Sequence, residues 1–520
     1  MDNKYILKSS CIFDSVSDEP FAGGVAVSGN KITGVYAAGE LDAHIEDGAQ
    51  VLDFGDKTIM PGFIDSHTHM GNFMEMADPD FCIDVSGSKS FEEVMAKISA
   101  FGKTHPDALL YAINFNHFDM TDGCDPSAEL IENYISDRPV MIMTWDCHTW
   151  YANHCAMDMA NMAGMEGYED GVLNDTASYP IQMLLARPPE ERKQSLQLFL
   201  GQMNATGITT VGDVFPCGVT LPYETYKAVE EDGKLTARIC FYPSLLDFTP
   251  EEVDKYKAEY SSDMLQFAGL KAILDGVLTV HTAWMLKPYT NAPDTCGSPV
   301  IDIDHLKQKI MEACELGINC RIHAIGDAAI RFCLDSFQEA NEAFGPCPKR
   351  HNIEHVEYCD PADVPRFAEL GVVANMHLGH SVFYIDNAID YLGTERVDHC
   401  FQWRNIKDTG AVMGTGSDFP VINFNPLPGI HAGVTRSRVD GYPDGGWMPD
   451  QKLTLPEALK MYTLGSAMAM NIEDKVGTLE EGKLADIVVL DRNIFDIAFS
   501  ELPEVKPEIT IVDGKKVYQK

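Results

Sequence analysis

An apolar run ends in two closely spaced histidines in the segment Pro61-Gly62-Phe63-Ile64-Asp65-Ser66-His67-Thr68-His69. Successive side chains of a strand alternate between its two faces, so His67 and His69 point the same way, with Asp65 on that face as well. Two imidazoles on one face at a strand end provide half of a metal site. Alone the pair is weak evidence, because two polar residues often end a strand.

The composition limits the classes of function. The 520 residues are 45% hydrophobic and 23% charged, which indicates a globular protein with one large domain and a smaller one. A formal net charge of −40 repels phosphate backbones and anionic lipids, so we expect a small-molecule substrate and neither nucleic acid nor a membrane as partner. The 14 cysteines form no Cys-x-x-Cys pair, and the N-terminus lacks a signal-peptide pattern. A cytoplasmic protein with reduced thiols is therefore expected, and assembly as a homo-oligomer is left open.

Both ends of the chain consist of short β-rich segments joined by turns. Near the N-terminus these include Gly24 to Ser28 and Lys31 to Tyr36, and near the C-terminus they include Ala485 to Leu490 and Ile509 to Val512. Each end is too small to bury a core alone. Residues 1–59 and 466–520 are therefore predicted to pair as one composite β-sandwich domain.

Residues 60–465 alternate apolar β-branched runs with helical stretches, the pattern of β/α units around a parallel sheet. Eight candidate strands predict a (β/α)8 barrel, with an insertion at about 75–200 that carries possible strands of its own at 111–115 and 140–144. The eight candidates are Met60–Ser66, Thr209–Val214, Arg238–Tyr242, Gly269–Leu274, Asn319–His323, Asn352–Val356, Val372–Met376 and Val412–Ser417.

Residues of the kind that bind metals gather at the ends of these candidate strands, where barrel active sites lie. They are His67, His69, Lys271, His323, His355 and Asp418. Imidazole and carboxylate without thiolate suit zinc, while manganese and iron remain open. Each residue alone has a structural explanation, such as a hydrogen-bonded core histidine or a helix cap at Asp418. The joint pattern on separate strands favours a metal site.

Six motifs occur in order along the chain: PGFIDSHTH, KAILDG, HAIGDAA, NIEHVE, GTGSDFPV and GTLEEGKLADIVVLD. Together they resemble the amidohydrolase superfamily, and specifically its amidohydrolase-3 (YtcJ-like) branch, which includes N-substituted formamide deformylases. The resemblance covers essentially the whole chain. It implies an α/β fold, a distorted TIM (β/α)8 barrel with a composite β-sandwich formed by the N- and C-terminal segments.

The resemblance also implies roles for the strand-end residues. His67 and His69 would bind the more buried metal, and His323 and His355 a second one. Lys271 resembles a lysine that is N6-carboxylated in many relatives and bridges two metals, because a neutral buried amine adds carbon dioxide to become a carbamate. Asp418 would carry the proton. Whether one or two ions are bound is left open.

The function expected from this site is metal-dependent hydrolysis of a non-peptide carbon–nitrogen bond in an amide, formamide or cyclic amide. A hydroxide generated at the metal would attack, and Asp418 would serve as general acid and base. The first alternative is a metal-dependent deaminase of a nitrogen heterocycle, against which Lys271 argues, since such deaminases usually lack this lysine. The second alternative is a non-catalytic protein on the same fold, which would typically have lost metal ligands.

Three residues are candidates for substrate binding. His148 lies in a segment that resembles an Asp-Gly-His-x-x-Trp-x-Asn motif of the branch, and a structural hydrogen bond explains it equally well. His281 stands where the branch commonly has an arginine, so a relative's anionic substrate does not transfer to this chain. Arg436 follows the last strand and could bind a carboxylate or form a surface ion pair. His377 and His380 lie near the barrel mouth, and nothing in the pattern gives them a role.

Overall fold

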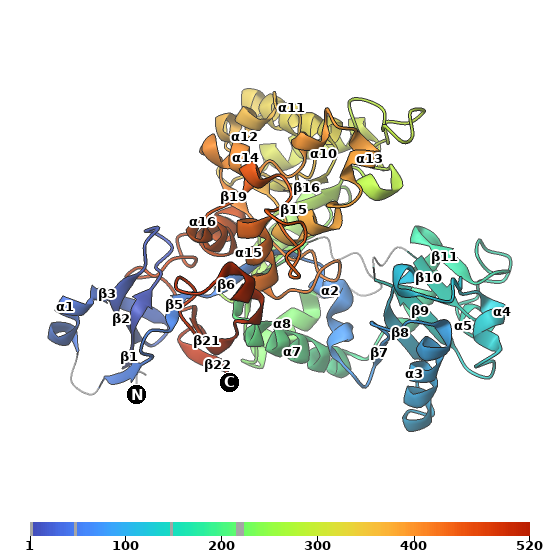
Figure 1. Cartoon of the computed structure of the whole chain (residues 1–520), viewed down its shortest axis with the longest axis horizontal. Helices are drawn as coiled ribbons and strands as arrows, with labels where there is room; N and C mark the ends of the chain where they lie inside the picture. Colours follow the sequence, from blue (N-terminus) through green and yellow to red (C-terminus); the bar gives the residue numbers. More distant parts are fainter. Residues whose placement is uncertain (1–3, 46–48, 146–148, 215–222) are drawn as a thin grey trace. The chain divides into compact units, whose positions relative to one another are not determined.

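The computed structural model describes residues 4–45, 49–145, 149–214 and 223–520 of the chain. The described residues belong to two compact units, and each is treated by itself below (Figure 1). Unit 1 comprises Met1–His69, Met203–Pro216 and Leu235–Lys520, and unit 2 comprises Met70–Gln202 and Cys217–Lys234. The predicted insertion at 75–200 falls within unit 2.

Unit 1 contains a closed barrel whose described residues form eight main strands. They are β6 (Phe63–Thr68), β12 (Ile208–Val214), β13 (Arg238–Tyr242), β15 (Leu270–Ile273), β16 (Cys320–Ala324), β17 (Asn352–His355), β18 (Val373–Asn375) and β19 (Met413–Gly414). They pair in parallel as two arcs, one from β6 to β13 with the short β14 (Leu265–Phe267) beside it, and one from β15 to β19. Bridges from Ser244 to Lys271 and from Thr68 to Phe419 join the arcs. The predicted α/β barrel is confirmed, and each predicted strand overlaps an observed one.

The barrel strands form here because both of their faces are covered. Every residue of β6, β12, β13 and β17 is buried, which is why the sequence shows continuous apolar runs rather than alternation. Helices follow the strands of the second arc, and α11 packs against β16. The principal helices of this unit are α9 (Pro250–Glu259), α10 (Ile303–Glu315), α11 (Asp327–Phe344), α12 (Val364–Leu370), α14 (Trp403–Asp408), α15 (Pro426–Thr435), α16 (Leu455–Lys460) and α17 (Ser466–Ala469).

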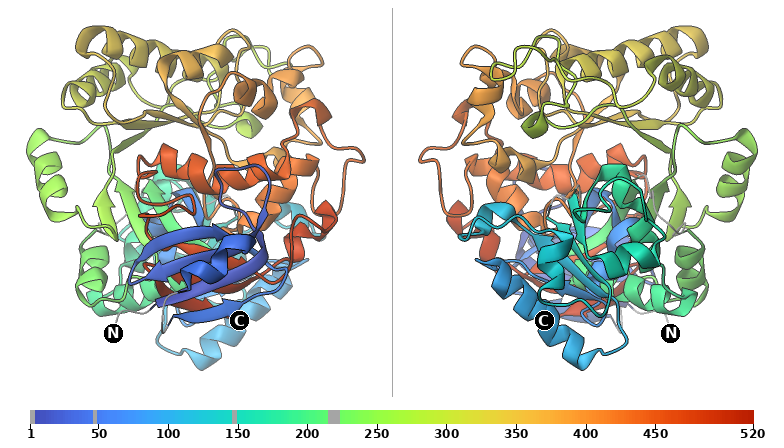
Figure 2. Two further views of the ribbon diagram at one scale, coloured as in Figure 1. Left: turned by 90° about the vertical axis from the view of Figure 1, so that its left-hand side faces the viewer. Right: turned by 90° about the vertical axis from the view of Figure 1, so that its right-hand side faces the viewer.

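Strands from the two ends of the chain join in one sheet of unit 1, as the blue and dark red strands in the left view of Figure 2 show. The strands are β1 (Lys4–Ile12), β2 (Phe21–Ser28), β3 (Lys31–Ala37), β4 (Gln50–Asp53), β5 (Thr58–Pro61), β20 (Ile487–Leu490), β21 (Pro507–Val512) and β22 (Lys515–Gln519). The two ends meet where β5 pairs antiparallel with β20, for example Met60 with Val488. Side chains from both ends, including Leu7 and Ile511, share one apolar cluster. Neither end could bury these side chains without the other.

Unit 2 is built on its own five-stranded sheet with the order β11-β10-β9-β8-β7. Its strands are β7 (Cys82–Asp84), β8 (Leu110–Phe115), β9 (Val140–Thr144), β10 (Thr149–Ala152) and β11 (Val172–Asn174), and its longer helices are α3 (Phe91–Thr104), α7 (Pro189–Ala205) and α8 (Tyr223–Glu231). The strands predicted at 111–115 and 140–144 coincide with β8 and β9. Apolar clusters on both faces of the sheet give this unit a core of its own.

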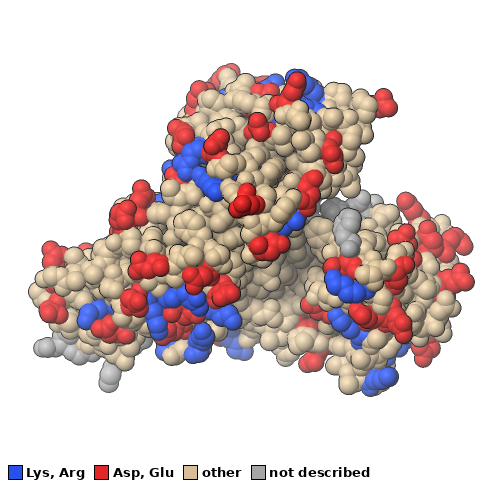
Figure 3. All heavy atoms as spheres, viewed as in Figure 1, with Lys and Arg blue, Asp and Glu red and all other residues tan. Residues whose placement is uncertain are grey.

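The surface carries the strong negative charge of the sequence. Asp and Glu side chains are spread over the face drawn in Figure 3, with Lys and Arg interspersed among them. A distributed excess of acid favours solubility rather than a dedicated docking site. Among the described residues, no helix combines the length and the apolarity that crossing a bilayer requires.

Candidate metal centre

His67, His69 and Asp418 meet at the carboxyl end of β6. Atom Oδ1 of Asp418 lies 3.1 Å from Nε2 of His67 and 3.1 Å from Nε2 of His69. His67 is fully buried and Asp418 nearly so, whereas part of the His69 ring reaches solvent. The structure therefore brings three of the six predicted ligands together here, and a fourth, His355, shares a second group with His67.

Two buried ring nitrogens at this centre have lone pairs that no described group satisfies with a hydrogen bond. The Nδ1 atom of His67 bonds to the ionised carboxylate of Glu354, so Nδ1 carries the proton and Nε2 presents a lone pair to Asp418. The Nδ1 atom of His377 likewise donates to the carbonyl of Gly416 at 3.1 Å, which leaves its Nε2 without a hydrogen-bond partner among the described residues. Acceptors that face each other across about 3 Å repel unless a cation lies between them.

Two further groups of side chains extend the centre along β17 and β18. His355 and His377 join His67 in one group, and His355, Glu357 and His380 form another, with the ligand atoms of each group within 4.8 Å of one another. In the described part of the chain, five of their buried atoms have no hydrogen-bond partner: His67 Nε2, His355 Nδ1, His377 Nε2, His380 Nε2 and Glu357 Oε2. Buried polar atoms without partners cost free energy, so a set of them converging on one place fits a divalent metal. Imidazole and carboxylate donors suit a zinc-class ion.

Unusual backbone conformations turn two of these residues inward. His355 and Val356 have φ angles of 74° and 47°, and Asp418 has φ of 55°. The strand alternation would send His355 to the face opposite that of Glu354, but the left-handed turn at its end lets both side chains enter the barrel. Non-glycine residues in this region store about 1 kcal/mol or more of strain each, which the surrounding packing has to offset. Such strain is common at functional sites.

Glu354 accepts hydrogen bonds from His67 and from two further buried side chains. Its carboxylate accepts hydrogen bonds from Arg321 at 2.7 and 3.1 Å and from the amide of Asn375 at 2.7 Å, and all four side chains including His67 are fully buried. Burial would raise the pKa of Glu354, but Arg321 and His67 hold it well below the ordinary value. The sequence analysis did not single out Glu354. A charged residue inside the buried run Asn352 to His355 was the signal that could have found it.

Asp65 and Ser417 fix the position of Asp418 from the neighbouring strand. Asp65 accepts hydrogen bonds from the backbone N–H of Ser417 at 2.9 Å and from its hydroxyl at 2.6 Å. Burial raises the pKa of Asp65 to about 7 in spite of these bonds. Asp65 therefore serves as an anchor for the loop after β19 and is not a member of the ligand groups found among the described residues.

Lys271 is placed inside the barrel on β15. It is 1% exposed, and burial lowers the pKa of its amine from 10.5 to about 8, while the charges of Glu354 and Asp418 oppose that shift. A low pKa makes the neutral amine accessible near physiological pH, which is the form that reacts with carbon dioxide. The environment is thus compatible with the predicted carbamate.

His323 lies beside the ligand groups but outside them. Its ring centroid is 4.2 Å from that of His355, whereas its Nε2 atom points to the carbonyl of Gly276 at 3.4 Å. Two residues that the sequence left without a role, His377 and His380, are members of the groups. His377 and His380, which follow β18, are therefore alternative ligands to His323 for a second metal beside His355.

The three predicted substrate residues have different outcomes. His148 lies outside the described residues. His281 is half-buried with φ of 60°, bonds through Nε2 to Asn291 at 2.9 Å, and its substrate role stays a prediction.

Arg436, the third candidate, is buried beside two tryptophan rings. It is 1% exposed and donates to the carbonyl of Trp447 at 3.0 Å, with its guanidinium carbon 4.1 Å from the Trp403 ring centroid and 5.2 Å from that of Trp447. These contacts favour a structural role for the guanidinium, and its contact with a substrate carboxylate stays a prediction.

Comparisons with known proteins agree with this architecture. Residues 50–518 match the model of a family described as the amidohydrolase family. The chain is 28% identical to Protein LONG AFTER FAR-RED 3 of Arabidopsis thaliana, over 99% of this chain and 91% of that protein. It is 26% identical to an N-substituted formamide deformylase of Arthrobacter pascens, over 96% and 95%. A metal-dependent hydrolase of Pyrococcus horikoshii, of 22% identity, shares the fold with a TM-score of 0.80 over 96% of this chain and 99% of that one.

Proposed function

Because the chain belongs to the amidohydrolase family, we propose that it is a metal-dependent hydrolase of a non-peptide carbon–nitrogen bond in a small amide, formamide or cyclic amide. The observation that carries the proposal is the approach of one Asp418 oxygen to within 3.1 Å of Nε2 on both His67 and His69. Those two nitrogens and the carboxylate oxygen are close enough to bind one cation together.

The residues that would hold the metal are His67, His69 and Asp418, with His355 at the edge of the same group of rings. When bound, a zinc-class ion supplies Lewis-acid polarisation of the scissile group and makes a water acidic near neutral pH. The second ion, if present, would draw on His355, His377, His380 and Glu357 as well as on the predicted His323. Zinc is the metal that this donor set favours.

Asp418 is proposed to move the proton. A cation held beside Asp418 by His67 and His69 would keep the group a carboxylate at neutral pH. As a carboxylate it accepts a proton from the attacking water and returns it to the leaving nitrogen. Ser417, anchored by Asp65, keeps the carboxylate aimed at the cluster.

Lys271 is proposed to be N6-carboxylated. The amine lies in a buried position on β15, and its lowered pKa favours the neutral nucleophile. A carbamate there would add an anionic ligand between two cations. This residue also favours amide hydrolysis over the competing function, a deaminase of a nitrogen heterocycle.

Formamides are the first substrate class to examine, because the likeness to the formamide deformylase extends over nearly the whole of both chains. Small molecules are the proposed partners, and free thiols at every described cysteine support a proposed cytoplasmic location.

The deciding experiment combines elemental analysis of the purified protein with a screen of N-formyl, N-acyl and cyclic amides and of amino-substituted heterocycles. A carboxylic acid and an amine formed in equal amounts, in step with zinc content, support the proposal. Ammonia released from a heterocycle without a carboxylic acid would establish the deaminase instead. Protein without a transition metal that hydrolyses none of them would favour a non-catalytic role.

A further inference from the structure

Lys271 lies directly opposite a second buried cation inside the barrel. In the parallel pairing of β15 with β16, Lys271 is the partner of Arg321, so the two side chains leave the same face of strands about 5 Å apart. Lys271 is 1% exposed, and Arg321 is fully buried. Like charges at opposite positions of a sheet repel each other, and the repulsion grows where water is excluded. A protonated amine at Lys271 is therefore unfavourable next to Arg321.

Glu354 neutralises Arg321 along one edge of its guanidinium only. The carboxylate accepts hydrogen bonds from Nε of Arg321 at 2.7 Å and from Nη2 at 3.1 Å. The same carboxylate also accepts hydrogen bonds from His67 and Asn375. In the part of the chain that the structure describes, Nη1 of Arg321 is buried without a hydrogen-bond partner. A buried guanidinium N–H without an acceptor is costly, so this second edge of Arg321 fits an anion.

Tyr242 supplies a second unsatisfied donor beside the same lysine. It lies on β13, which meets β15 through the bridge between Ser244 and Lys271. The guanidinium carbon of Arg321 lies 4.6 Å from the centroid of the Tyr242 ring, so side chains from β13 and β16 are in contact. Oη of Tyr242 is buried and has no hydrogen-bond partner among the described residues. Two buried donors therefore come from the strands on either side of Lys271.

We propose that Arg321 and Tyr242 are positioning residues that hold a carbamate on Lys271, with Nη1 and Oη as its hydrogen-bond donors. The inference rests on the proposed carboxylation of Lys271 and identifies the side chains of this chain that stabilise the carbamate without a metal ion. The neutral amine attacks the carbon of carbon dioxide and forms a nitrogen–carbon bond, while one carbon–oxygen π pair moves to oxygen. The surplus proton on the nitrogen passes to water. The product carries one negative charge, so two facing cations are replaced by a pair of opposite charges.

The chemistry of the donors matches that of a carbamate. A carbamate has two acceptor oxygens in one plane, as a carboxylate does, and guanidinium N–H groups recognise such oxygens with strong charge-assisted hydrogen bonds. Arg321 then has an anion at each edge, Glu354 at Nε and Nη2 and the carbamate at Nη1. The phenol O–H of Tyr242 can donate to the carbamate as well. The modification thus removes a repulsion and satisfies two buried donors.

The test supplies the full-length protein, as purified and after removal of metal by a chelator, with increasing ¹³C-bicarbonate at slightly alkaline pH. The carbamate ¹³C signal then gives the bicarbonate concentration at half-occupancy. In metal-free Arg321→Gln we expect this concentration to rise about tenfold or more, because a charge-assisted hydrogen bond is lost and a protonated Lys271 can then neutralise Glu354. In Tyr242→Phe it should rise several-fold without a lower melting temperature, since the hydroxyl that is removed has no partner among the described residues.

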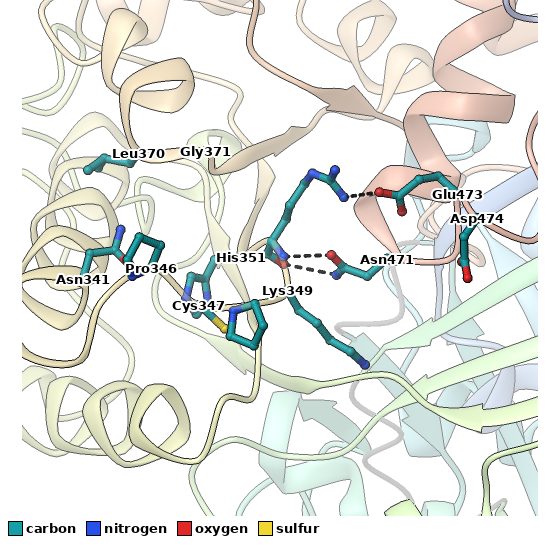
Figure 4. Close-up of a pocket in the computed structure, with 12 residues that line it drawn as sticks. Asn341, Pro346, Cys347, Lys349, His351, Leu370, Gly371, Asn471, Glu473 and Asp474 are labelled. Atoms are coloured by element: carbon teal, nitrogen blue, oxygen red, sulfur yellow. Dashed lines mark hydrogen bonds and ion pairs between the residues drawn. The ribbon is translucent and has the colours of Figure 1, made fainter.

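Arg350→Gln is the matched control, because it also removes an arginine that is paired with a glutamate. Arg350 binds Glu473 at 2.6 Å on the wall of a separate cavity of about 620 Å³, which Asn471 also lines (Figure 4). Neither Lys271 nor Arg321 lines that cavity, so the carbamate occupancy of Arg350→Gln should equal that of the parent.

The outcomes separate this inference from the proposed function. A parent protein without a carbamate signal in either preparation would refute the carboxylation of Lys271, and the inference with it. A parent signal whose bicarbonate dependence is unchanged in Arg321→Gln and in Tyr242→Phe would overturn only the roles of these two side chains. If Arg321→Gln does not fold, Tyr242→Phe decides alone, because a purely structural tyrosine would leave the occupancy at the parent value.

Discussion

Glu354 on β17 accepts a hydrogen bond from Nδ1 of His67 on β6, two strands that are not neighbours in the barrel. The bond therefore crosses the barrel interior and ties its first and second arcs together beneath the metal centre. Because Nδ1 is committed, Nε2 is the nitrogen left to face Asp418. One buried carboxylate thus determines both the orientation and the tautomer of a proposed metal ligand.

Replacement of Glu354 by glutamine should destabilise the metal-free protein. The buried Arg321 would lose its partner charge, so the free energy of unfolding from urea denaturation should fall by about 3–5 kcal/mol. Glu339→Gln is the control, since its ion pair with Lys307 is exposed and should be worth less than about 1 kcal/mol. Equal effects of the two variants would show that the buried Glu354 carboxylate does not stabilise the barrel.

Asp418→Asn should separate proton transfer from metal binding. The amide keeps an oxygen near His67 and His69 but cannot take a proton, so we expect kcat to fall by about 10²- to 10⁴-fold while most of the metal remains. Turnover of the substrate found by screening and elemental analysis provide the two measurements. Asp386→Asn, at an exposed ion pair with Arg438, should leave both unchanged. Normal turnover by Asp418→Asn would exclude it as the proton carrier.

The barrel could be predicted because its strands are buried on both faces. Apolar runs such as Arg238 to Tyr242 stand out in the sequence for that reason. Residues that can bind a metal occur at the carboxyl ends of these runs, which predicts an active site at that end of the barrel. The pairing of the chain's two ends was predictable as well, since neither end has enough apolar surface to form a core. The strand order within the resulting sheet was not, because it depends on contacts such as Met60 with Val488 across more than four hundred residues.

The roles of individual residues in the candidate site were harder to predict from the sequence than the fold. His377 enters the ligand groups only because β18 ends beside β17, and a histidine in a loop carries no signal of that neighbour. Arg436 suggested a carboxylate site, but Trp403 and Trp447 approach it from separate segments. In both cases the role depends on which residues surround the side chain, and these are set by tertiary packing rather than by local pattern.

Lys271 should form a carbamate in the metal-free protein supplied with ¹³C-bicarbonate. Carbon dioxide adds to the neutral amine, and the pKa of about 8 means that this form grows as pH rises towards and through 8, well below the range of an ordinary lysine. A carbamate ¹³C signal should therefore be small two units below that pKa and increase above it. Lys271→Arg should show no such signal at any pH, and persistence of the signal in that variant would assign it to another amine.

His377→Gln should weaken metal binding by about tenfold or more. Its Nε2 atom lies in a ligand group with His67 and His355, and the amide is a poorer donor to a zinc-class ion. Affinity can be measured by competition with a chelator of known affinity. His281→Gln is the matched control, because His281 bonds to Asn291 and lies outside the ligand groups, so the same exchange there should leave metal affinity unchanged. Equal metal affinities of the two variants would show that His377 is not a metal ligand.

Arg436→Lys should lower stability and leave substrate affinity unchanged. Lysine preserves the positive charge but not the planar contact with Trp403 and Trp447, and a desolvated cation–π contact of this kind contributes about 2 kcal/mol. We therefore expect a clear drop in the free energy of unfolding, with KM within about twofold of the parent value. Arg438→Lys, at a more exposed position over Tyr442, should change neither quantity appreciably. A large rise in KM at unchanged stability would instead mean that the guanidinium binds substrate, because loss of a purely structural contact lowers the free energy of unfolding and leaves KM unchanged.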